Sequence, residues 1–260
     1  MKSPSAPPLD GPTVHAKTGW CVEHQPVVTS THDIAAARLR AGASPPLVVV
    51  ADEQTAGRGR EGRRFHSPPG GLYASLLVAA SPLVEPAPLV AAAAVAVAEA
   101  LEALGARDVE IKWPNDVWIG GRKVSGILLE RVEGGERALV GIGINLARVP
   151  LELPADVARR TTCVADALGR VPSRTEVLIE LLPRLDARMG DACDPARTGR
   201  LEDGWRARLA LRGQMVRFRQ AGQARAGVLE DASFTEGLLV RDGSGPRWRP
   251  AAHVVDLTPA

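Results

Sequence analysis

Residues 121–145 read GRKVSGILLERVEGGERALVGIGIN, and the pattern in this stretch sets the secondary structure around which the rest is arranged. Val124–Glu130 and Ala138–Ile144 are rich in apolar and β-branched residues, which is typical of buried strands. Glu133-Gly134-Gly135 between them favours a reversal of the chain. The stretch therefore predicts a β-hairpin.

Working outward, apolar runs predict further strands at 47–50, 72–78 and 109–113. A short helix is predicted after Ser30-Thr31, because hydroxyl side chains cap helices and Gly42 follows as a stop signal. The Ala-rich stretch 88–104 ends at Gly105 and predicts a longer helix packed on the sheet.

The second half of the chain predicts two more helices and a change of architecture. Ser173-Arg-Thr-Glu176 is a capping box that opens a helix toward Met189, with a kink or break expected at Pro183. Another helix is expected over 200–211. From Gln214 onward short alternating segments predict a small all-β domain of about 45 residues. At the other end, residues 1–19 are rich in Pro, Ser and Gly and predict a disordered tail.

Composition narrows the class of protein. Of the 260 residues 45% are apolar, and 32 basic residues face 30 acidic ones, so a broad basic field for nucleic acid is not indicated. The longest apolar run, Leu89–Ala98, is shorter than the roughly 20 residues of a membrane span. Cys21, Cys163 and Cys193 form no CxxC pair, and the N-terminus lacks a signal-peptide core, which together favour a reducing cytoplasm.

The segment Gly57–Arg64 (GRGREGRR) is the first candidate site. It matches the dinucleotide fingerprint G-x-G-x-x-G, but that fingerprint needs a helix directly after the loop, and the stretch 67–71 (SPPGG) cannot form one. Glycines allow backbone N–H groups to approach a ligand, and arginines supply planar forks for phosphate or carboxylate. The segment predicts an anion cradle, and a solvated basic loop is the alternative.

Ile111–Asp116 (IKWPND) is the second candidate site. Lys112 ends a predicted strand and Pro114 takes the chain out of it, which would present an ammonium group at a sheet edge. Such a lysine could bridge a carboxylate and a phosphate as a fixed point charge. An ordinary turn at Asn115-Asp116 is the alternative.

Three glycines within predicted strands form the third candidate. Gly126, Gly141 and Gly143 would together leave a flat floor on which a small ring could lie. A bulge or tight strand packing explains any single one of them equally well.

Together these segments resemble the biotin protein ligase family. The matching pieces follow the family's order over residues 28–146: Ser30-Thr31, Gln54, Gly57–Arg63, Ser67-Pro68, Gly71–Tyr73, Lys112–Asp116, Gly121–Glu130 and Gly141–Asn145. The resemblance implies an α+β fold, with a central mixed sheet flanked by helices and a small C-terminal SH3-like β-barrel. It also implies a catalytic domain over 20–211 and a barrel over 212–260.

The resemblance further implies a two-step reaction with biotin, ATP and Mg²⁺. Biotin's carboxylate attacks the α-phosphate of ATP to give biotinyl-5′-adenylate and pyrophosphate. A lysine of a biotin carboxyl carrier domain of a carboxylase then attacks the adenylate and expels AMP. The expected partners include neither DNA nor a membrane, and the expected state is a monomer or a weak homodimer.

Residue roles carried over from the family are expectations of the same kind. Lys112 and Arg60 would be catalytic, and no residue is assigned as a metal ligand. The residues expected to bind biotin or its adenylate are Ser30, Thr31, His32, Gln54, Gly57, Arg58, Gly59, Arg60, Arg63, Lys112, Asn115, Gly126, Gly141 and Gly143.

Two positions depart from the family pattern. His32 stands where the family usually has Asn. Two interpretations follow: His32 contacts the ligand, or it is a first-turn helix residue that faces solvent. Phe65 stands where Trp is common, which keeps a hydrophobic lid without an N–H donor. About 27 residues precede Thr29, too few for the helix-turn-helix domain of repressor-type members, so we expect a ligase only. A lipoate-type ligase and a nucleic-acid binding module are the rival hypotheses.

Overall fold

A seven-stranded mixed sheet forms the centre of the larger part of the chain. The computed structural model describes residues 8–132, 134–147, 155–250 and 254–260. The strands lie in the order β1-β2-β3-β7-β6-β5-β4, with β1 and β2 parallel and the other neighbours antiparallel. Their bounds are β1 (Cys21–Val28), β2 (Leu47–Gln54), β3 (Leu72–Ala79), β4 (Val109–Lys112), β5 (Asp116–Ile119), β6 (Arg122–Arg131) and β7 (Arg137–Ile144).

The predicted hairpin is confirmed as β6 and β7. Gly126 lies opposite Gly143, and β7 pairs on its other side with β3, where Tyr73 lies opposite Gly143. Strands β1 and β5 were not predicted. β1 contains Pro26, which only an edge strand accommodates readily, and β5 has four residues, too few for a clear alternating pattern.

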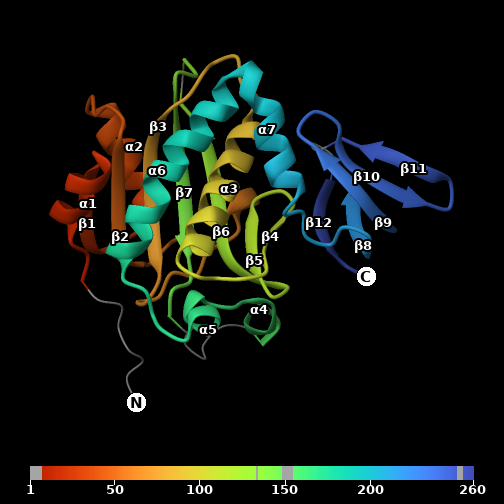
Figure 1. Ribbon diagram of the computed structural model, residues 1–260, viewed down its shortest axis with the longest axis horizontal. Coiled ribbons are helices and arrows are strands. Elements are labelled where there is room, and N and C mark those ends of the chain that lie inside the picture. Colours follow the sequence, from red (N-terminus) through yellow and green to blue (C-terminus); the bar gives the residue numbers. More distant parts are fainter. Residues whose placement is uncertain (1–7, 133, 148–154, 251–253) are drawn as a thin grey trace.

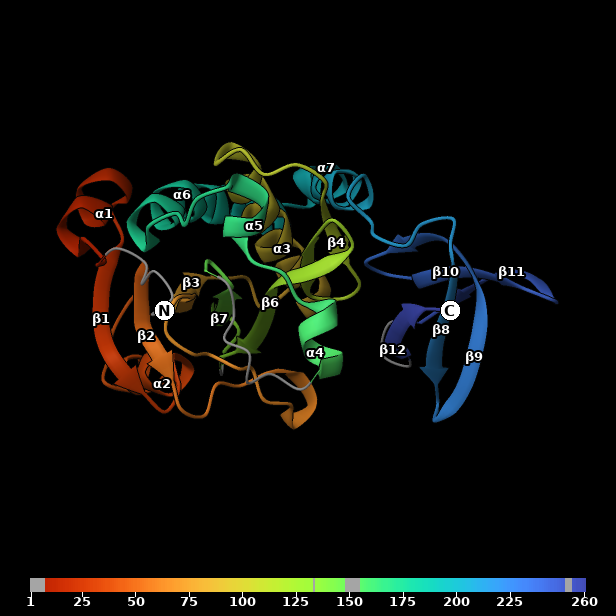
Figure 2. The ribbon, with the colours of Figure 1, turned by 90° about the horizontal axis from the view of Figure 1, so that it is seen from below.

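Helices cover the two faces of the sheet unequally. Figures 1 and 2 show α1 (Gly11–Thr18), α3 (Pro86–Ala103), α6 (Arg174–Cys193) and α7 (Pro195–Arg206) on one face and α2 (Thr31–Arg40) on the other. The short helices α4 (Ala155–Arg160) and α5 (Val164–Leu168) lie at one end of the sheet. Of these helices, α2 therefore covers one face and the other four cover the opposite face.

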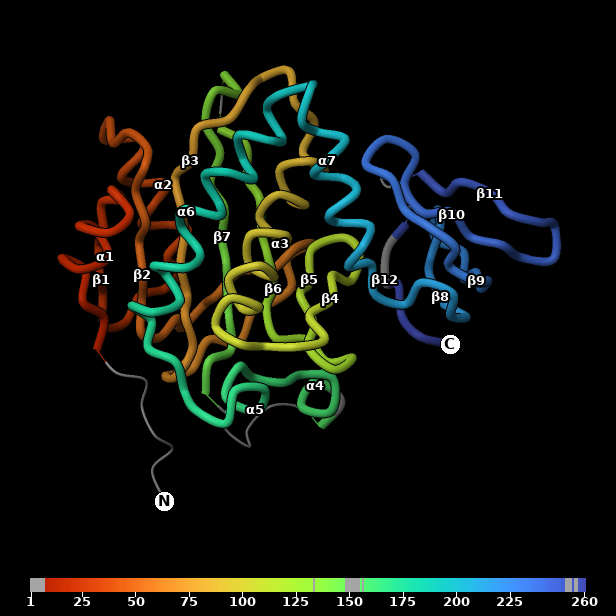
Figure 3. The backbone as a smooth tube through the Cα atoms, in the orientation of Figure 1, coloured from red at the N-terminus to blue at the C-terminus, as the bar shows by residue number. Residues whose placement is uncertain are grey.

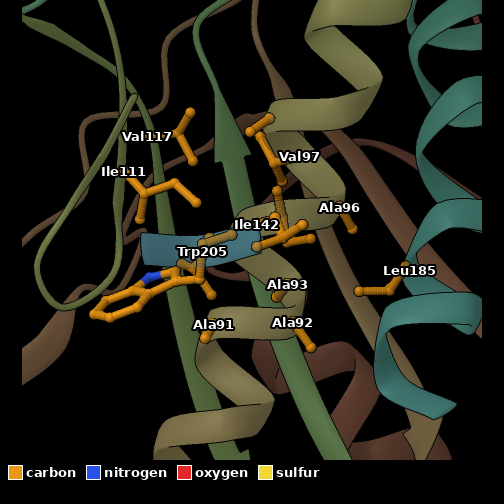
Figure 4. Packing of buried hydrophobic residues seen from close by; sticks show 14 of the residues in the cluster. Ala91, Ala92, Ala93, Ala96, Val97, Ile111, Val117, Ile142, Leu185 and Trp205 are labelled. Atoms are coloured by element: carbon orange, nitrogen blue, oxygen red, sulfur yellow. The ribbon is translucent and has the colours of Figure 1, made fainter. Parts of the chain in front are cut away.

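Helix α3 is the centre of the main hydrophobic core. Its 18 residues are long and apolar enough to cross a membrane by length and composition, but most of them are buried within the fold. In Figure 4, Leu185 of α6 points toward α3 from one side, and Ile142 of β7 lies beneath it. The small alanine side chains let α3 approach both neighbours closely, so α3 is a core helix of this fold.

The predicted disordered tail is wrong for the part that the structure describes. Gly11–Thr18 form α1, capped by Asp10, whose side chain accepts a hydrogen bond from the Thr13 N–H. Pro12 fits within the first turn of a helix, where its missing N–H costs nothing, and Val14 is fully buried. Residues 1–7 lie outside the described residues.

Two helix predictions in the second half also need correction. Helix α6 is not broken at Pro183, although the proline has no N–H to donate to the Ile179 carbonyl; the Arg184 guanidinium donates to the next carbonyl, that of Glu180, at 2.7 Å. Helix α7 begins at Pro195 after the Asp194 cap rather than near residue 200. It ends at Arg206, because the following segment hydrogen-bonds to Ile111 of β4 instead.

A second, antiparallel sheet lies in the position predicted for the small β-barrel. Its order is β11-β10-β9-β8-β12, with bounds β8 (Met215–Gln220), β9 (Gln223–Ser233), β10 (Gly237–Asp242), β11 (Gly245–Arg249) and β12 (Val254–Pro259). Figure 3 shows it beside the β4–β5 end of the large sheet. Trp205 of α7 packs between Trp113 and Phe234, with ring centroids 5.7 and 5.3 Å away, and Arg206 pairs with Asp231.

We predict that Trp205→Ala lowers the free energy of unfolding by about 3–5 kcal/mol, because it removes a ring that is 1% exposed and leaves a cavity between the two sheets. Chemical denaturation measures this. Leu83→Ala, at a side chain that is 92% exposed, is the control and should change stability by less than about 0.5 kcal/mol. Equal effects of the two substitutions would contradict the packing role of Trp205.

Candidate active site

A cavity of about 210 Å³ opens on the face of the sheet that carries α2. Its walls come from the start of α2, the segment 58–65, the turn after β4, the strands β3, β6 and β7, and β12. Every predicted site residue except Gly57 lines it: Ser30, Thr31, His32, Gln54, Arg58, Gly59, Arg60, Arg63, Lys112, Asn115, Gly126, Gly141 and Gly143. The glycine–arginine segment and Lys112 therefore share one cavity.

One end of the cavity is a fixed network of uncharged polar groups. The Gln54 side-chain oxygen accepts from the backbone N–H and the hydroxyl of Thr31, at 2.9 and 3.0 Å. Its amide nitrogen donates to the Ser67 hydroxyl at 2.8 Å, and the Thr31 and Ser75 hydroxyls lie 2.9 Å apart. Since Ser30 caps α2 at the same place, the positive end of the helix dipole also faces this end.

The glycine–arginine segment folds back on itself as a tight loop. A single 3-10 turn, Arg60–Gly62, has Glu61 and Gly62 in the left-handed region, at φ 56° and 70°. The Gly59 N–H donates to the Arg63 carbonyl at 2.7 Å. Gly57 lies outside the lining: a Cβ there would be 2.5 Å from the Phe65 carbonyl oxygen, so this glycine permits close packing under the loop.

The arginines of the loop have different partners. Arg60 donates to the Asn115 side-chain oxygen at 3.3 Å, and Asn115 in turn donates to the Ile127 carbonyl at 2.7 Å. Arg58 pairs with Asp33 at 2.5 Å, and Arg63 pairs with Glu61 at 2.6 Å. Arg60 thus connects the loop to the turn after β4, and both residues of this hydrogen bond line the cavity.

Two lysines supply charge at the other end of the cavity. Lys112 ends the edge strand β4, as predicted, and burial lowers the pKa of its ammonium group; the Asp116 carboxylate opposes this shift, and neighbouring cations add to it. Lys123 of β6 also lines the cavity, with its Nζ 2.6 Å from Asp116. Sequence reasoning missed Lys123 and Asp116 as site residues, although both belong to segments that it quoted.

The predicted glycine floor is present, and Phe65 lies on it. A Cβ at Gly143 would be 2.5 Å from the Phe65 ring, and one at Gly126 would be 3.1 Å from it. The Lys123 ammonium lies 5.8 Å from the ring centroid. The glycines therefore leave space for a flat group against β6 and β7, and an aromatic ring from the loop fits there.

The C-terminal sheet supplies an apolar part of the wall. Val254 and Leu257 of β12 line the cavity and are almost fully buried. Figures 1 and 2 show β12 near the β4–β5 end of the large sheet, which is the end that carries Lys112. No pattern in the sequence pointed to these two residues.

Comparison with known proteins agrees with this architecture. Residues 25–146 match the sequence model of the biotin/lipoate A/B protein ligase family, and the chain belongs to that family.

The relatives named as biotin ligases align over most of the chain. The biotin–[acetyl-CoA-carboxylase] ligase of Paracoccus denitrificans is 32% identical, over 87% of this chain and 97% of its own. That of Mycobacterium tuberculosis is 30% identical over 92% of each. The Aquifex aeolicus biotin protein ligase in complex with biotin and ATP superposes with a TM-score of 0.79 at 28% identity, over 92% of this chain and 99% of that one.

A further group of relatives is longer than this chain. The bifunctional ligase/repressor BirA of Bacillus spizizenii is 36% identical over 65% of this chain, but the match spans only about half, 53%, of its own length.

We predict that Lys112→Met raises the free energy of unfolding at pH 7. Burial lowers the pKa of Lys112 in the folded state. Below that pKa the ammonium group is charged, and its burial destabilises the folded state relative to the unfolded state. Between the lowered pKa and the ordinary lysine value the unfolded state binds more protons, so wild-type stability rises with pH. The advantage of the variant should therefore shrink in that window, which denaturation at a series of pH values measures.

Lys17→Met, at an exposed lysine of α1, is the control and should change stability by less than about 0.5 kcal/mol at every pH. A Lys112→Met advantage that stays constant across the alkaline range would contradict the assignment to burial.

Proposed function

We propose that this chain activates biotin with ATP to biotinyl-5′-adenylate and transfers the biotinyl group to a lysine of a biotin carboxyl carrier domain. The observation that carries the proposal is the single cavity with a neutral polar network at one end and cationic side chains at the other. Biotin has the matching shape, with a cyclic urea at one end and a carboxylate at the other. The names of the Paracoccus and Mycobacterium relatives support the same activity.

The polar network is suited to the urea ring. Ser30, Thr31 and Gln54 would hydrogen-bond its N–H and carbonyl groups. The Thr31–Gln54 hydrogen bonds, and the bond that the Ser30 hydroxyl accepts from the His32 N–H, hold these side chains in place before ligand arrives, so little ordering is needed on binding. The bicyclic ring would lie against Gly126, Gly141 and Gly143 in place of the Phe65 ring, which covers two of these glycines here.

The cationic end is suited to adenylation. Biotin's carboxylate oxygen forms a bond to the α-phosphorus, the bond to the β-phosphate oxygen breaks, and pyrophosphate leaves. Two anions must meet for this step, and Arg58, Arg60 and Lys112 would reduce their repulsion and hold them in line. Lys123 lines the same end and adds a further fixed charge. In the second step the carrier amine attacks the acyl carbon, loses a proton and displaces AMP.

Mg²⁺ would enter with the ATP. Among the described residues no group of three or more His, Cys, Asp or Glu side chains could hold a metal ion alone. Mg²⁺ in nucleotide sites is usually bound by phosphates, waters and one or two carboxylates, and Asp116 lines the cavity where the phosphates would lie. The ion would neutralise phosphate charge there.

The proposal includes a macromolecular substrate, an oligomeric state and a cellular compartment. The carrier domain of a carboxylase is the macromolecular substrate, and neither DNA nor a membrane takes part. We propose a monomer or a weak homodimer, since β1 pairs only with β2 among the described strands and its outer edge is free for a further strand. The three cysteines are all free, which suits the cytoplasm.

The proposal predicts biotinyl-adenylate as a product. The chain would be incubated with biotin, ATP and Mg²⁺, and mass spectrometry would detect the adenylate and, with a carrier domain added, biotinylated lysine. Lys112→Ala should abolish adenylate formation while the protein stays folded, because the charge that screens the two anions is gone. Lipoate in competition tests the rival ligase. Faster turnover of lipoate than of biotin would reject the proposal. Pyrophosphate release by Lys112→Ala at the wild-type rate would reject the role of Lys112.

We also predict that Arg60→Gly releases the adenylate at least about tenfold faster, because it removes the side chain that joins the loop to Asn115 in the cavity wall. Dissociation of labelled adenylate into a chase of unlabelled biotin and ATP measures the rate. Arg122→Gly, at an exposed arginine outside the cavity, is the matched control. Equal retention by both variants would show that Arg60 does not close the cavity.

A further inference from the structure

His32 is a buried imidazole in the wall of the cavity. Its side chain is 4% exposed, and its Nε2 lies 2.9 Å from a carboxylate oxygen of Glu130 on β6. Its other ring nitrogen, Nδ1, is screened from solvent and has no hydrogen-bond partner among the residues that the structure describes. Nδ1 faces the floor at Gly141, where a Cβ would lie 3.5 Å from it.

The pairing with Glu130 decides which nitrogen carries the proton. A carboxylate only accepts hydrogen bonds, so Nε2 must donate to it. In the neutral imidazole Nδ1 is then an acceptor with a bare lone pair. A buried acceptor without a partner is unfavourable, and such groups usually find a partner in the functional state. For the neutral imidazole the missing partner is therefore a donor.

We propose that His32 determines specificity for the urea ring, with Nδ1 accepting a hydrogen bond from one ureido N–H of bound biotin. This inference rests on the proposed function and adds a named donor–acceptor pair to it. His32 lies one residue after Thr31 and beside Gly141, so it adjoins both the polar network and the glycine floor. Glu130 is a positioning residue that holds the acceptor toward the ligand.

The test uses two cyclic carbamate analogues of biotin, each with one ureido N–H replaced by a ring oxygen. In one of the two analogues the replaced group is the N–H that would donate to His32 Nδ1. The ring oxygen then places its lone pair opposite that of Nδ1. Calorimetry with wild-type protein should show that analogue binding about 10-fold to 100-fold more weakly than biotin. In His32→Leu the acceptor is gone, so the same replacement should cost at least about fivefold less than in wild type.

Two further variants address positioning. Glu130→Gln keeps an acceptor for the Nε2 proton and should discriminate like wild type, whereas Glu130→Leu frees the ring and should discriminate less. Glu130 has a 58% exposed side chain, so both variants should fold even if His32→Leu does not. His24→Leu is the matched control, since His24 makes the same 2.9 Å pair with Asp52 outside the cavity and should leave discrimination unchanged.

The outcomes separate this inference from the proposed function. If biotin binds and both analogues lose the same factor in wild type and His32→Leu, or if wild type binds all three ligands equally, the role of His32 is refuted and the ligase proposal stands. If wild type does not bind biotin, the ligase proposal itself fails.

Discussion

The pairing of β6 with β7 is the constraint on which the site depends. Gly126 faces Gly143 across this pair, and β3 and β5 extend the sheet on either side. Two strands with glycine at facing positions present bare backbone instead of side chains, which creates a hollow in a sheet that is otherwise covered. The hollow has a rigid floor because each strand is hydrogen-bonded on both sides, so the loop and α2 can arrange side chains around it.

The hollow carries an excess of positive charge that the chain as a whole does not have. The net charge of the chain is +2, yet the described lining includes four arginines and two lysines against two carboxylates, Glu61 and Asp116. Burial lowers the pKa of Lys112, which shows that positive charge is held at a cost to folding in the absence of an anion. Such a site favours ligands that bring their own negative charge, and the same burial strengthens the attraction once they are bound.

The small C-terminal sheet also contributes to the cavity. It is anchored to α7 through Trp205 and Phe234, and from there β12 brings Val254 and Leu257 to the cavity wall. The ring of Trp205 also contacts Trp113, next to Lys112. The aromatic packing that joins the two sheets therefore also supports the turn that carries the cationic end of the cavity.

The sequence by itself determined the central hairpin, the buried helix α3, the loop at 57–64 and about half of the cavity lining, because glycine, proline and arginine at those positions have strong local requirements. It failed where contacts between distant segments override local preference. Gly11–Thr18 is a helix because its cap and the burial of Val14 outweigh a Pro-rich composition, and 207–211 leaves the helix to pair with β4. Tertiary structure alone decided that Gly57 packs beneath the loop, that β12 reaches the cavity, and that Glu130 pairs with one ring nitrogen of His32 while the other has no partner among the described residues. The last two facts depend on contacts between residues about 100 or more positions apart along the chain, which composition and periodicity do not encode.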